Sequence, residues 1–399
     1  MAKHTLSTDV VIIGAGIAGL WLHHRLNAMG FHALLLENKQ IGNAQTLSSQ
    51  GIIHGGAKYA LNGILSTATH AIGEMPARWQ ACLKGEGDID LTSVNVLTDH
   101  QLLWSKEQLS SKIISFFASK ALSSRMQTVD RSAQPAPFAD PKFKGALYRL
   151  DEPVLDIPSV LTALAKPWQD RIIKTPDNAP LSWQQQSQTL SSLHIGDDFE
   201  IHAQQLVCTA GEGNQALINA LGFQKPTMQR RPLQMVLCKA KNKLTPLPAI
   251  YAHSLGTGSK PIATITSHFD NDGNTVWYIG GNIAESGINK SFSELTREAQ
   301  TLLNEILSWH TLPELEWLTH SVNRAEPKQS TLSRPDTAFV ESINSVHIAW
   351  PTKLALAPDL ADKVIAKLLK TKLSKGEHQN PTSVATASFG QSLWNQTFR

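Results

Sequence analysis

Two short apolar runs flank a helical pattern at the start of the chain. Residues 9–13 are apolar after an initial aspartate and lead into a glycine, as a buried parallel strand does. Over residues 17–29 the apolar side chains recur on one helical face, and residues 33–36 form a second apolar run that ends at Glu37. This order predicts a strand–helix–strand unit.

The rest of the chain predicts further helices and strands. Helical periodicity covers most of residues 65–124 and recurs at 158–166, at 293–309 with Ser293 as its cap, and at 359–369. Alternating or β-branched runs predict strands at 199–209, 233–237, 262–266, 275–279 and 346–350, with a hairpin turn at 270–274. A proline-rich linker is expected at 134–141 and a polar tail from residue 376.

The length of 399 residues predicts two domains. The α/β pattern stands at both ends and in the middle of the chain, with antiparallel strands and helices inserted between these parts. The predicted fold class is therefore α/β, or α+β overall, with a Rossmann-like nucleotide-binding domain interleaved with an antiparallel-sheet domain. We expect residues 1–75, 150–222 and 331–399 in the first domain, and 76–149 and 223–330 in the second.

Composition and charge exclude several classes of protein. With 41% hydrophobic and 17% charged residues and a net charge of +3, the chain is globular and too evenly charged to predict a nucleic-acid partner. No apolar run is long enough for a membrane span, and no signal peptide is recognisable, so we expect a cytoplasmic protein. Three scattered cysteines predict buried, reduced thiols. No HExxH motif, Cys/His cluster or GxSxG occurs, so neither a metal site nor a serine hydrolase is expected.

A dinucleotide fingerprint follows the first predicted strand and opens the first predicted helix. It has the form GxGxxG and consists of Gly14, Ala15, Gly16, Ile17, Ala18 and Gly19. The first glycine permits the tight turn, the second lets the backbone approach a pyrophosphate, and the third lets helix and strand pack closely. Glu37, followed by Asn38, ends the second strand, where a carboxylate accepts hydrogen bonds from ribose hydroxyls and repels a 2′-phosphate. The combination predicts dinucleotide binding and disfavours NADP.

Two later segments favour FAD over NAD as this dinucleotide. Residues 206–211 resemble the second glycine-ended strand of FAD enzymes, and residues 354–359 resemble the C-terminal return that touches the flavin. The whole chain resembles the D-amino-acid-oxidase-like (DAO) superfamily of FAD-dependent oxidoreductases, especially its 2-hydroxyglutarate and glycerol-3-phosphate dehydrogenases. The matching segments, in order, are residues 14–37, 47–56, 151–164, 209–211, Arg324 with Pro327, 334–336 and 346–366.

The resemblance implies FAD as cofactor and a second set of contacts to it. The expected residues are Ser48, Ser49, Gln50, Gly51, Ala210, Gly211, Thr352, Lys353 and Leu354. The chain departs from the family before its last helix, where Trp350-Pro351-Thr352-Lys353 replaces the usual glycines. A bulkier loop is therefore expected at the flavin ring.

Enzymes of this family transfer a hydride to flavin N5 from a substrate carbon that bears an amine or a hydroxyl. Their substrates are commonly small carboxylates. The resemblance implies Arg324 as the anion-binding residue, with Arg230, Arg231 and Arg334 as weaker rivals; an ion pair with Glu326 or Asp336 is the structural alternative. His54 is expected at the flavin as a base, as a substrate-positioning group or as a covalent link. Lys353 either places positive charge near flavin N1 and O2 or is a solvated loop residue. Tyr59, Tyr251, His253 and Tyr278 are pocket candidates, each with ordinary packing as the alternative.

Three functions are consistent with these patterns. The first is an FAD-dependent dehydrogenase or oxidase of a small hydroxy or amino acid, and the IHGG segment favours a hydroxyl substrate. The second is a flavoprotein that acts on a larger molecule, such as a modified RNA base or a lipid. The third is a non-catalytic FAD-binding module. The electron acceptor is open among oxygen, a quinone and a protein.

Overall fold

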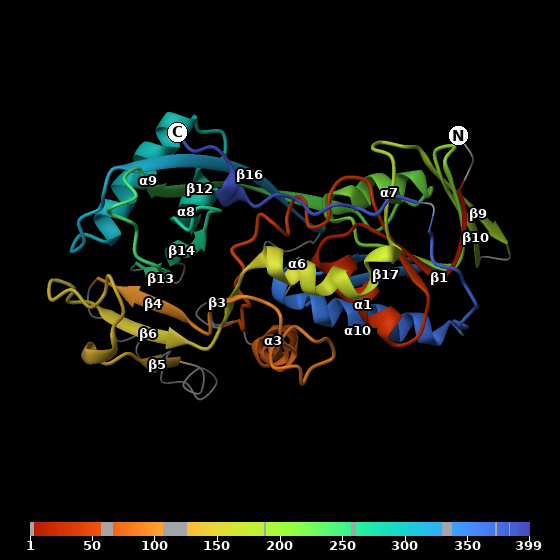
Figure 1. Cartoon of the computed structure of the whole chain (residues 1–399), viewed down its shortest axis with the longest axis horizontal. Coiled ribbons are helices and arrows are strands. Elements are labelled where there is room, and N and C mark those ends of the chain that lie inside the picture. Colours follow the sequence, from red (N-terminus) through yellow and green to blue (C-terminus); the bar gives the residue numbers. More distant parts are fainter. Residues whose placement is uncertain are drawn as a thin grey trace.

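The computed structural model contains two large β-sheets at opposite ends of an elongated molecule (Figure 1). It describes residues 4–56, 67–106, 126–186, 189–256, 261–328, 337–371, 373–382 and 384–399. The predicted class is confirmed, because a largely parallel sheet with helices on it is interleaved with a largely antiparallel one. The exact domain boundaries stay a prediction.

The first sheet forms around the predicted strand–helix–strand unit. Its main path has the order β17 (Phe339–Ile343), β18 (Val346–Trp350), β11 (Phe199–Cys208), β1 (His4–Ile13), β2 (Ala33–Glu37) and β8 (Ile172–Lys174). Strands β18, β11, β1, β2 and β8 are parallel, whereas β17 is antiparallel to β18. Strands β9 (Leu181–Gln186) and β10 (Thr189–Ile195) extend from β11 as an antiparallel hairpin.

The helices of this domain lie on both faces of the sheet. On one face α1 (Ile17–Ala28), α6 (Ile157–Ala165) and α10 (Ala357–Lys370) share a core with Val10 and Ile12 of β1, and α3 (Thr67–Leu83) lies beside it. On the other face Val11 packs in a second core to which α7 (Asn214–Ala220) contributes Ile218. The alternation of strand side chains between two buried faces explains why residues 10–13 of β1 are apolar without interruption.

The second sheet is the antiparallel part. Its order is β16 (Leu315–Pro327), β12 (Met228–Ala240), β15 (Thr275–Gly281), β14 (Pro261–Phe269), β13 (Tyr251–Leu255), β4 (Gln101–Ser105), β6 (Ala146–Leu150) and β5 (Met126–Thr128). Among these described strands, only the β13–β4 pair is parallel. Helix α9 (Phe292–Ile306) packs Leu295, Ala299 and Leu303 into its core, and α8 (Asn282–Ser286) follows β15. A separate two-stranded ladder pairs β3 (Val96–Thr98) with β7 (Val154–Leu155).

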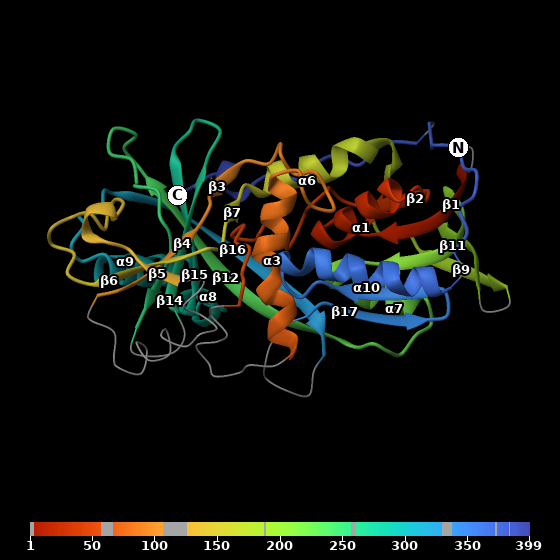
Figure 2. The same cartoon turned by 90° about the horizontal axis from the view of Figure 1, so that it is seen from below.

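Strands β12 and β16 connect the two ends of the molecule. They pair along their full length, from Met228 opposite Pro327 to Ala240 opposite Leu315. Both extend between the second sheet and the first domain, in opposite chain directions (Figure 2). Side chains near Arg324 on β16 are thereby carried to the junction between the sheets.

Two local predictions need correction. The stretch expected to be helical to residue 124 contains β3 and β4, because these strands find partners in β7, β6 and β13, far away in sequence. The cap of α9 is Ser291, not Ser293: its hydroxyl accepts the Glu294 N–H in a capping box.

The expected polar tail instead packs along both sheets. Residue 389 bridges to Ile41, and residue 386 bridges to Ile173. Farther on, Leu393, Trp394 and Phe398 complete a core on the second sheet, and Arg399 exchanges main-chain hydrogen bonds with Trp317. The scattered apolar residues of this segment fit three different cores, so they show no single period in the sequence.

Two remaining predictions agree with the structure. All three cysteines are buried and free. Among the described residues, no helix is both long and apolar enough to cross a bilayer.

Candidate functional site

The GxGxxG turn shows why two of its glycines are required by packing. Gly14 has a φ of +105°, and a Cβ added to it would lie 2.5 Å from Ala210 Cα. A Cβ on Gly19 would lie 2.0 Å from the Gly14 carbonyl oxygen. These two glycines let β1, α1 and the end of β11 pack against one another.

Gly16 is different, because only one atom lies near the place that a Cβ would take. Its φ is −79°, and the nearest atom to an added Cβ is the Thr46 hydroxyl at 3.2 Å. Gly16 caps the N-terminus of α1, where Ile17 N–H donates to Thr46 Oγ1 at 3.1 Å. The site thus has the open backbone and the positive end of a helix dipole that a pyrophosphate needs, and a side chain at position 16 would fill that space.

Glu37 is fixed beside this turn by two main-chain donors. Its Oε2 accepts the Ala15 N–H and its Oε1 accepts the Lys39 N–H, each at 2.8 Å. A carboxylate accepts about four hydrogen bonds, so roughly two remain for ribose hydroxyls. Asn38 is exposed, and its carbonyl accepts a hydrogen bond from the Lys174 ammonium.

The two later cofactor segments converge on the same turn. Ala210 contacts Gly14, and Trp350 Nε1 donates to the Gly211 carbonyl at 2.9 Å. After Trp350 the chain turns through Thr352, whose φ is +62°, and enters a 3₁₀ turn at Leu354–Leu356. A β-branched residue in the left-handed region costs on the order of 1–3 kcal/mol, which is the backbone consequence of replacing the family's glycines in this loop.

The segment after Thr46 runs from the first domain to the second sheet. Gln50 Nε2 donates to the carbonyl oxygens of Tyr278 and Thr264, at 2.9 and 3.2 Å. The Tyr278 hydroxyl donates to the Ser48 carbonyl at 2.7 Å, and the Ser48 hydroxyl lies 2.8 Å from His320 Nε2. These bonds tie the segment to β14, β15 and β16.

Two members of the segment have further contacts within the first domain. Ser49 Oγ donates to the Thr46 carbonyl at 2.8 Å. Gly51 has a φ of +73°, and a Cβ on it would lie 2.2 Å from the Leu155 carbonyl. Both contacts fix the path of the segment toward His54.

His54, at the end of this segment, joins two side chains that are distant in sequence. Its Nδ1 lies 3.2 Å from Glu152 Oε2, and Glu152 Oε1 accepts the Gly55 N–H at 2.7 Å. The His253 ring stacks against the His54 ring with centroids 6.0 Å apart, and His253 Nδ1 lies 2.8 Å from Thr264 Oγ1. The His54 side chain is 25% exposed and that of Glu152 only 7%, so an imidazole at the surface of the site is backed by a buried carboxylate.

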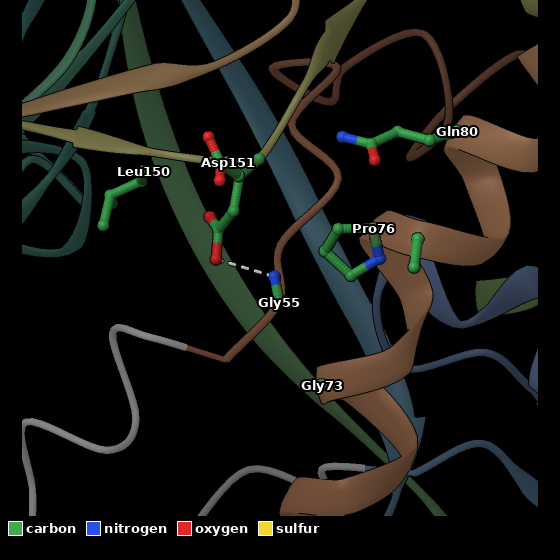
Figure 3. A pocket seen from close by; sticks show the side chains of 8 residues that line it. Gly55, Gly73, Pro76, Gln80, Leu150 and Asp151 are labelled. Carbon is green, nitrogen blue, oxygen red and sulfur yellow. Dashed lines mark hydrogen bonds between the residues drawn. The ribbon is translucent and has the colours of Figure 1, made fainter. Parts of the chain in front are cut away.

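A pocket of about 160 Å³ opens next to this cluster. Gly55 and Glu152 line it together with Leu150, Asp151 and several residues of α3. Figure 3 shows Pro76 and Gln80 on the α3 side, Asp151 on the other side and Gly55 between them. The pocket gives the Glu152 side of the cluster a route to solvent.

Three of the arginine candidates lie on the paired strands β12 and β16. Arg324 is half-buried on β16, opposite Arg231 on β12, and its Nε donates to the Arg231 carbonyl at 3.4 Å. Arg231 forms an ion pair with Glu326, and Arg230 forms one with Glu212. The residue after Arg324 donates its N–H to Gln45 at 3.2 Å, so Arg324 lies where β16 meets the cofactor segments.

The other predicted residues differ in their burial and contacts. Tyr251 is half-buried on β13, two residues before His253, and burial raises the pKa of its phenol to about 12. Tyr278 is completely buried with its hydroxyl bonded to Ser48, so its contacts support the core rather than a pocket. Lys353 is half-buried before the 3₁₀ turn. Tyr59, Arg334 and Asp336 lie outside the described residues.

Sequence reasoning missed Glu152, Thr46 and Gln45 as neighbours of the site. Glu152 stands in the Asp-Glu-Pro connection between β6 and β7, 98 residues after His54, and nothing in that local sequence points to an imidazole partner. Thr46 precedes the recognised segment by one residue, and its helix-capping contact to Ile17 became visible only in the fold.

Comparisons with known proteins agree with this arrangement. The sequence profile of the FAD dependent oxidoreductase family, DAO, matches residues 9–340. The probable FAD-dependent oxidoreductase PA4991 of Pseudomonas aeruginosa is 43% identical over 394 residues, which cover 98% of this chain and 99% of that protein. Its crystal structure superposes with a TM-score of 0.85 at 38% identity and covers 98% of this chain and 99% of that chain.

Two more distant proteins are similar in part or in fold. One subunit of the anaerobic glycerol-3-phosphate dehydrogenase of Haemophilus influenzae is 40% identical over 58 residues, 14% of this chain and 10% of that protein. Glycine oxidase from Geobacillus kaustophilus has a TM-score of 0.63 at 14% identity and covers 94% of this chain and 100% of that chain. At this identity the second similarity concerns the fold alone.

Proposed function

The chain belongs to the DAO family of FAD-dependent oxidoreductases, and from that premise we propose that it oxidises a small hydroxy or amino acid with His54 as the proton acceptor. Bound FAD supplies the acceptor for the hydride. The protein must bind the substrate, orient its reacting carbon, exclude water and take up one proton. The observation that carries the proposal is the His54–Glu152 pair at the end of the cofactor segment.

The pair has the geometry of a base and its positioning group. When His54 Nδ1–H donates to Glu152, the other ring nitrogen, Nε2, carries the lone pair that can accept a proton from a hydroxyl or amine. The buried carboxylate also stabilises the imidazolium that results. The Gly55 N–H holds the far oxygen of Glu152, so the carboxylate keeps its orientation while His54 changes its charge.

Substrate binding is assigned to the β16 side. A guanidinium recognises a carboxylate with two parallel hydrogen bonds, and Arg324 stands at the junction of β16 with the cofactor segments. Tyr251 and His253 both belong to β13, from which His253 reaches the His54 ring. Lys353, next to the unusual Thr352 turn, is the proposed source of positive charge on the cofactor side.

Anaerobic mixing of the flavin-loaded protein with a panel of small hydroxy and amino acids tests the proposal. We expect at least one of them to bleach the flavin absorbance. His54→Gln should slow that reduction by roughly 10²- to 10⁴-fold, the usual contribution of a general base, while the flavin stays bound. Glu152→Gln removes one charge-assisted hydrogen bond of about 1.5–3 kcal/mol and should slow it by roughly 10- to 150-fold.

His310→Gln is the matched control, because His310 lies beyond the end of α9, outside this cluster. Equal rates for His54→Gln and His310→Gln would remove His54 from the chemistry. A panel that never bleaches the flavin would refute a small acid as substrate and favour a larger molecule.

A further inference from the structure

His54, Glu152 and His253 together have the composition of a transition-metal site. Each offers one ligand atom, and the three atoms lie within 4.8 Å of one another. The residues come from three separate places: the end of the cofactor segment, the β6–β7 connection and strand β13. Two imidazoles and one carboxylate are a frequent donor set for Zn²⁺ and related ions, whereas Mg²⁺ and Ca²⁺ prefer oxygen ligands.

The spacing of the first two ligands suits a tetrahedral ion. His54 Nδ1 and Glu152 Oε2 are 3.2 Å apart. Bonds of about 2.0–2.1 Å to a tetrahedral zinc place neighbouring ligand atoms about 3.3 Å from each other. The pair therefore already has the separation of one tetrahedral edge, and the His253 ring lies beside the His54 ring.

The remaining atoms of two ligands are held by neighbours. Glu152 Oε1 accepts the Gly55 N–H, which leaves Oε2 for an ion. His253 Nδ1 lies 2.8 Å from the Thr264 hydroxyl, a contact that orients its ring. Metal-bound imidazoles and carboxylates are characteristically oriented by such outer contacts.

Burial and access also fit an ion. Glu152 is 6% exposed and His253 2%, and a carboxylate at this depth is stabilised by a cation. The pocket lined by Gly55 and Glu152 provides an approach from solvent. With three protein ligands, a fourth position stays open for water or a substrate oxygen.

We propose that His54, Glu152 and His253 bind one divalent transition-metal ion of the zinc class. An ion on His54 Nδ1 forces the ring into the tautomer whose Nε2 carries hydrogen, so Nε2 no longer accepts a proton. Metal binding should therefore inhibit the oxidation. This inhibitory consequence rests on the proposed function, whereas the binding itself does not.

Calorimetric titration of the flavin-loaded protein, treated with EDTA and then freed of it, tests the site. ZnCl₂ should show one saturable site per chain, and MgCl₂ should show none at the same concentrations. His253→Gln should weaken zinc binding at least roughly tenfold, because it removes one of three ligands. His310→Gln, a histidine outside the cluster, should bind zinc like the unmodified protein.

Glu152→Gln is a second variant with nearly unchanged shape, and retained flavin absorbance shows that both variants are folded. The proposal is overturned if the unmodified protein lacks the saturable zinc site, or if His253→Gln and Glu152→Gln bind zinc with the same affinity and stoichiometry as it does. The effect of zinc on flavin reduction by the substrate is a separate measurement, which tests the inhibitory consequence. Zinc that binds at this site and leaves flavin reduction unchanged would support the site and refute His54 as the proton acceptor.

Discussion

Replacing Gly16 with valine should separate cofactor binding from folding. A Cβ at this position meets only the Thr46 hydroxyl, at 3.2 Å, and the φ of −79° is open to every residue type. The protein should therefore fold, although a branched side chain at the helix cap costs about 1 kcal/mol of unfolding free energy. The same side chain fills the open space over the first turn of α1, where the main-chain N–H groups would otherwise meet the pyrophosphate.

The expected loss of FAD affinity follows from these donors. A hydrogen bond from a main-chain N–H to a phosphate oxygen contributes about 1.5–3 kcal/mol, and blocking two of them removes about 3–6 kcal/mol. That range corresponds to a dissociation constant raised about 10²- to 10⁴-fold. Gly19→Ala should behave differently, because its Cβ would lie 2.0 Å from the Gly14 carbonyl and disturbs the β1–α1 packing itself.

The assay is the flavin absorbance of the purified variant, followed by calorimetric titration with FAD and by circular dichroism. Gly16→Val should be folded and colourless, with weak FAD binding. The FAD dissociation constant of Gly16→Ala should lie between those of Gly16→Val and the unmodified protein. A Gly16→Val variant that purifies with one FAD per chain and an unchanged dissociation constant would refute this account of the glycine-rich turn.

Three further changes test the substrate anchor and the C-terminal segment. Arg324→Ala should raise the substrate concentration for half-maximal flavin reduction by roughly 10- to 150-fold, the contribution of a charge-assisted pair, with FAD retained; unchanged saturation would remove it from the site. Trp394→Ala should lower the unfolding free energy, measured by urea denaturation, by about 3–5 kcal/mol, because this buried ring stacks on the His268 ring with centroids 4.1 Å apart. Leu244→Ala, at an exposed site, should change the unfolding free energy little. Burial lowers the pKa of His268 to about 3, so only the unfolded chain gains its proton between pH 6.5 and that value. As the pH falls through this window, His268 should lower the unfolding free energy by up to about 1.4 kcal/mol per pH unit. Burial also lowers the pKa values of His23 and His347, so His268→Phe should make the decline between pH 6.5 and 5 less steep without abolishing it.

The nucleotide-binding turn could be predicted because its residues are contiguous. This turn is built from a strand at 9–13, three glycines and the helix that follows. These parts interact mainly with one another, so local sequence specifies their geometry. Glu37 belongs to the same unit, since a parallel strand directly beside β1 must end near the turn. The order of glycine-ended strands along the chain likewise made the family recognisable.

Local sequence was a poor guide where the partner of a segment is distant. Residues 96–105 were expected to be helical, but they form strands because β7, β6 and β13 provide partners for them. The C-terminal residues looked like a polar tail because their few apolar side chains enter three different cores, two in the first domain and one on the second sheet. In both cases tertiary pairing decided the structure.

The sequence by itself determined the fold class, the family and the glycine-rich turn, and it predicted a role for His54. Only the tertiary structure brought Glu152 and His253 to that histidine, from positions about a hundred residues apart along the chain. The physical reason is that a side-chain cluster depends on how segments far apart in the sequence pack together, which no periodicity in the sequence specifies. A glycine-rich turn needs only its own backbone, whereas a histidine with its carboxylate needs the whole fold.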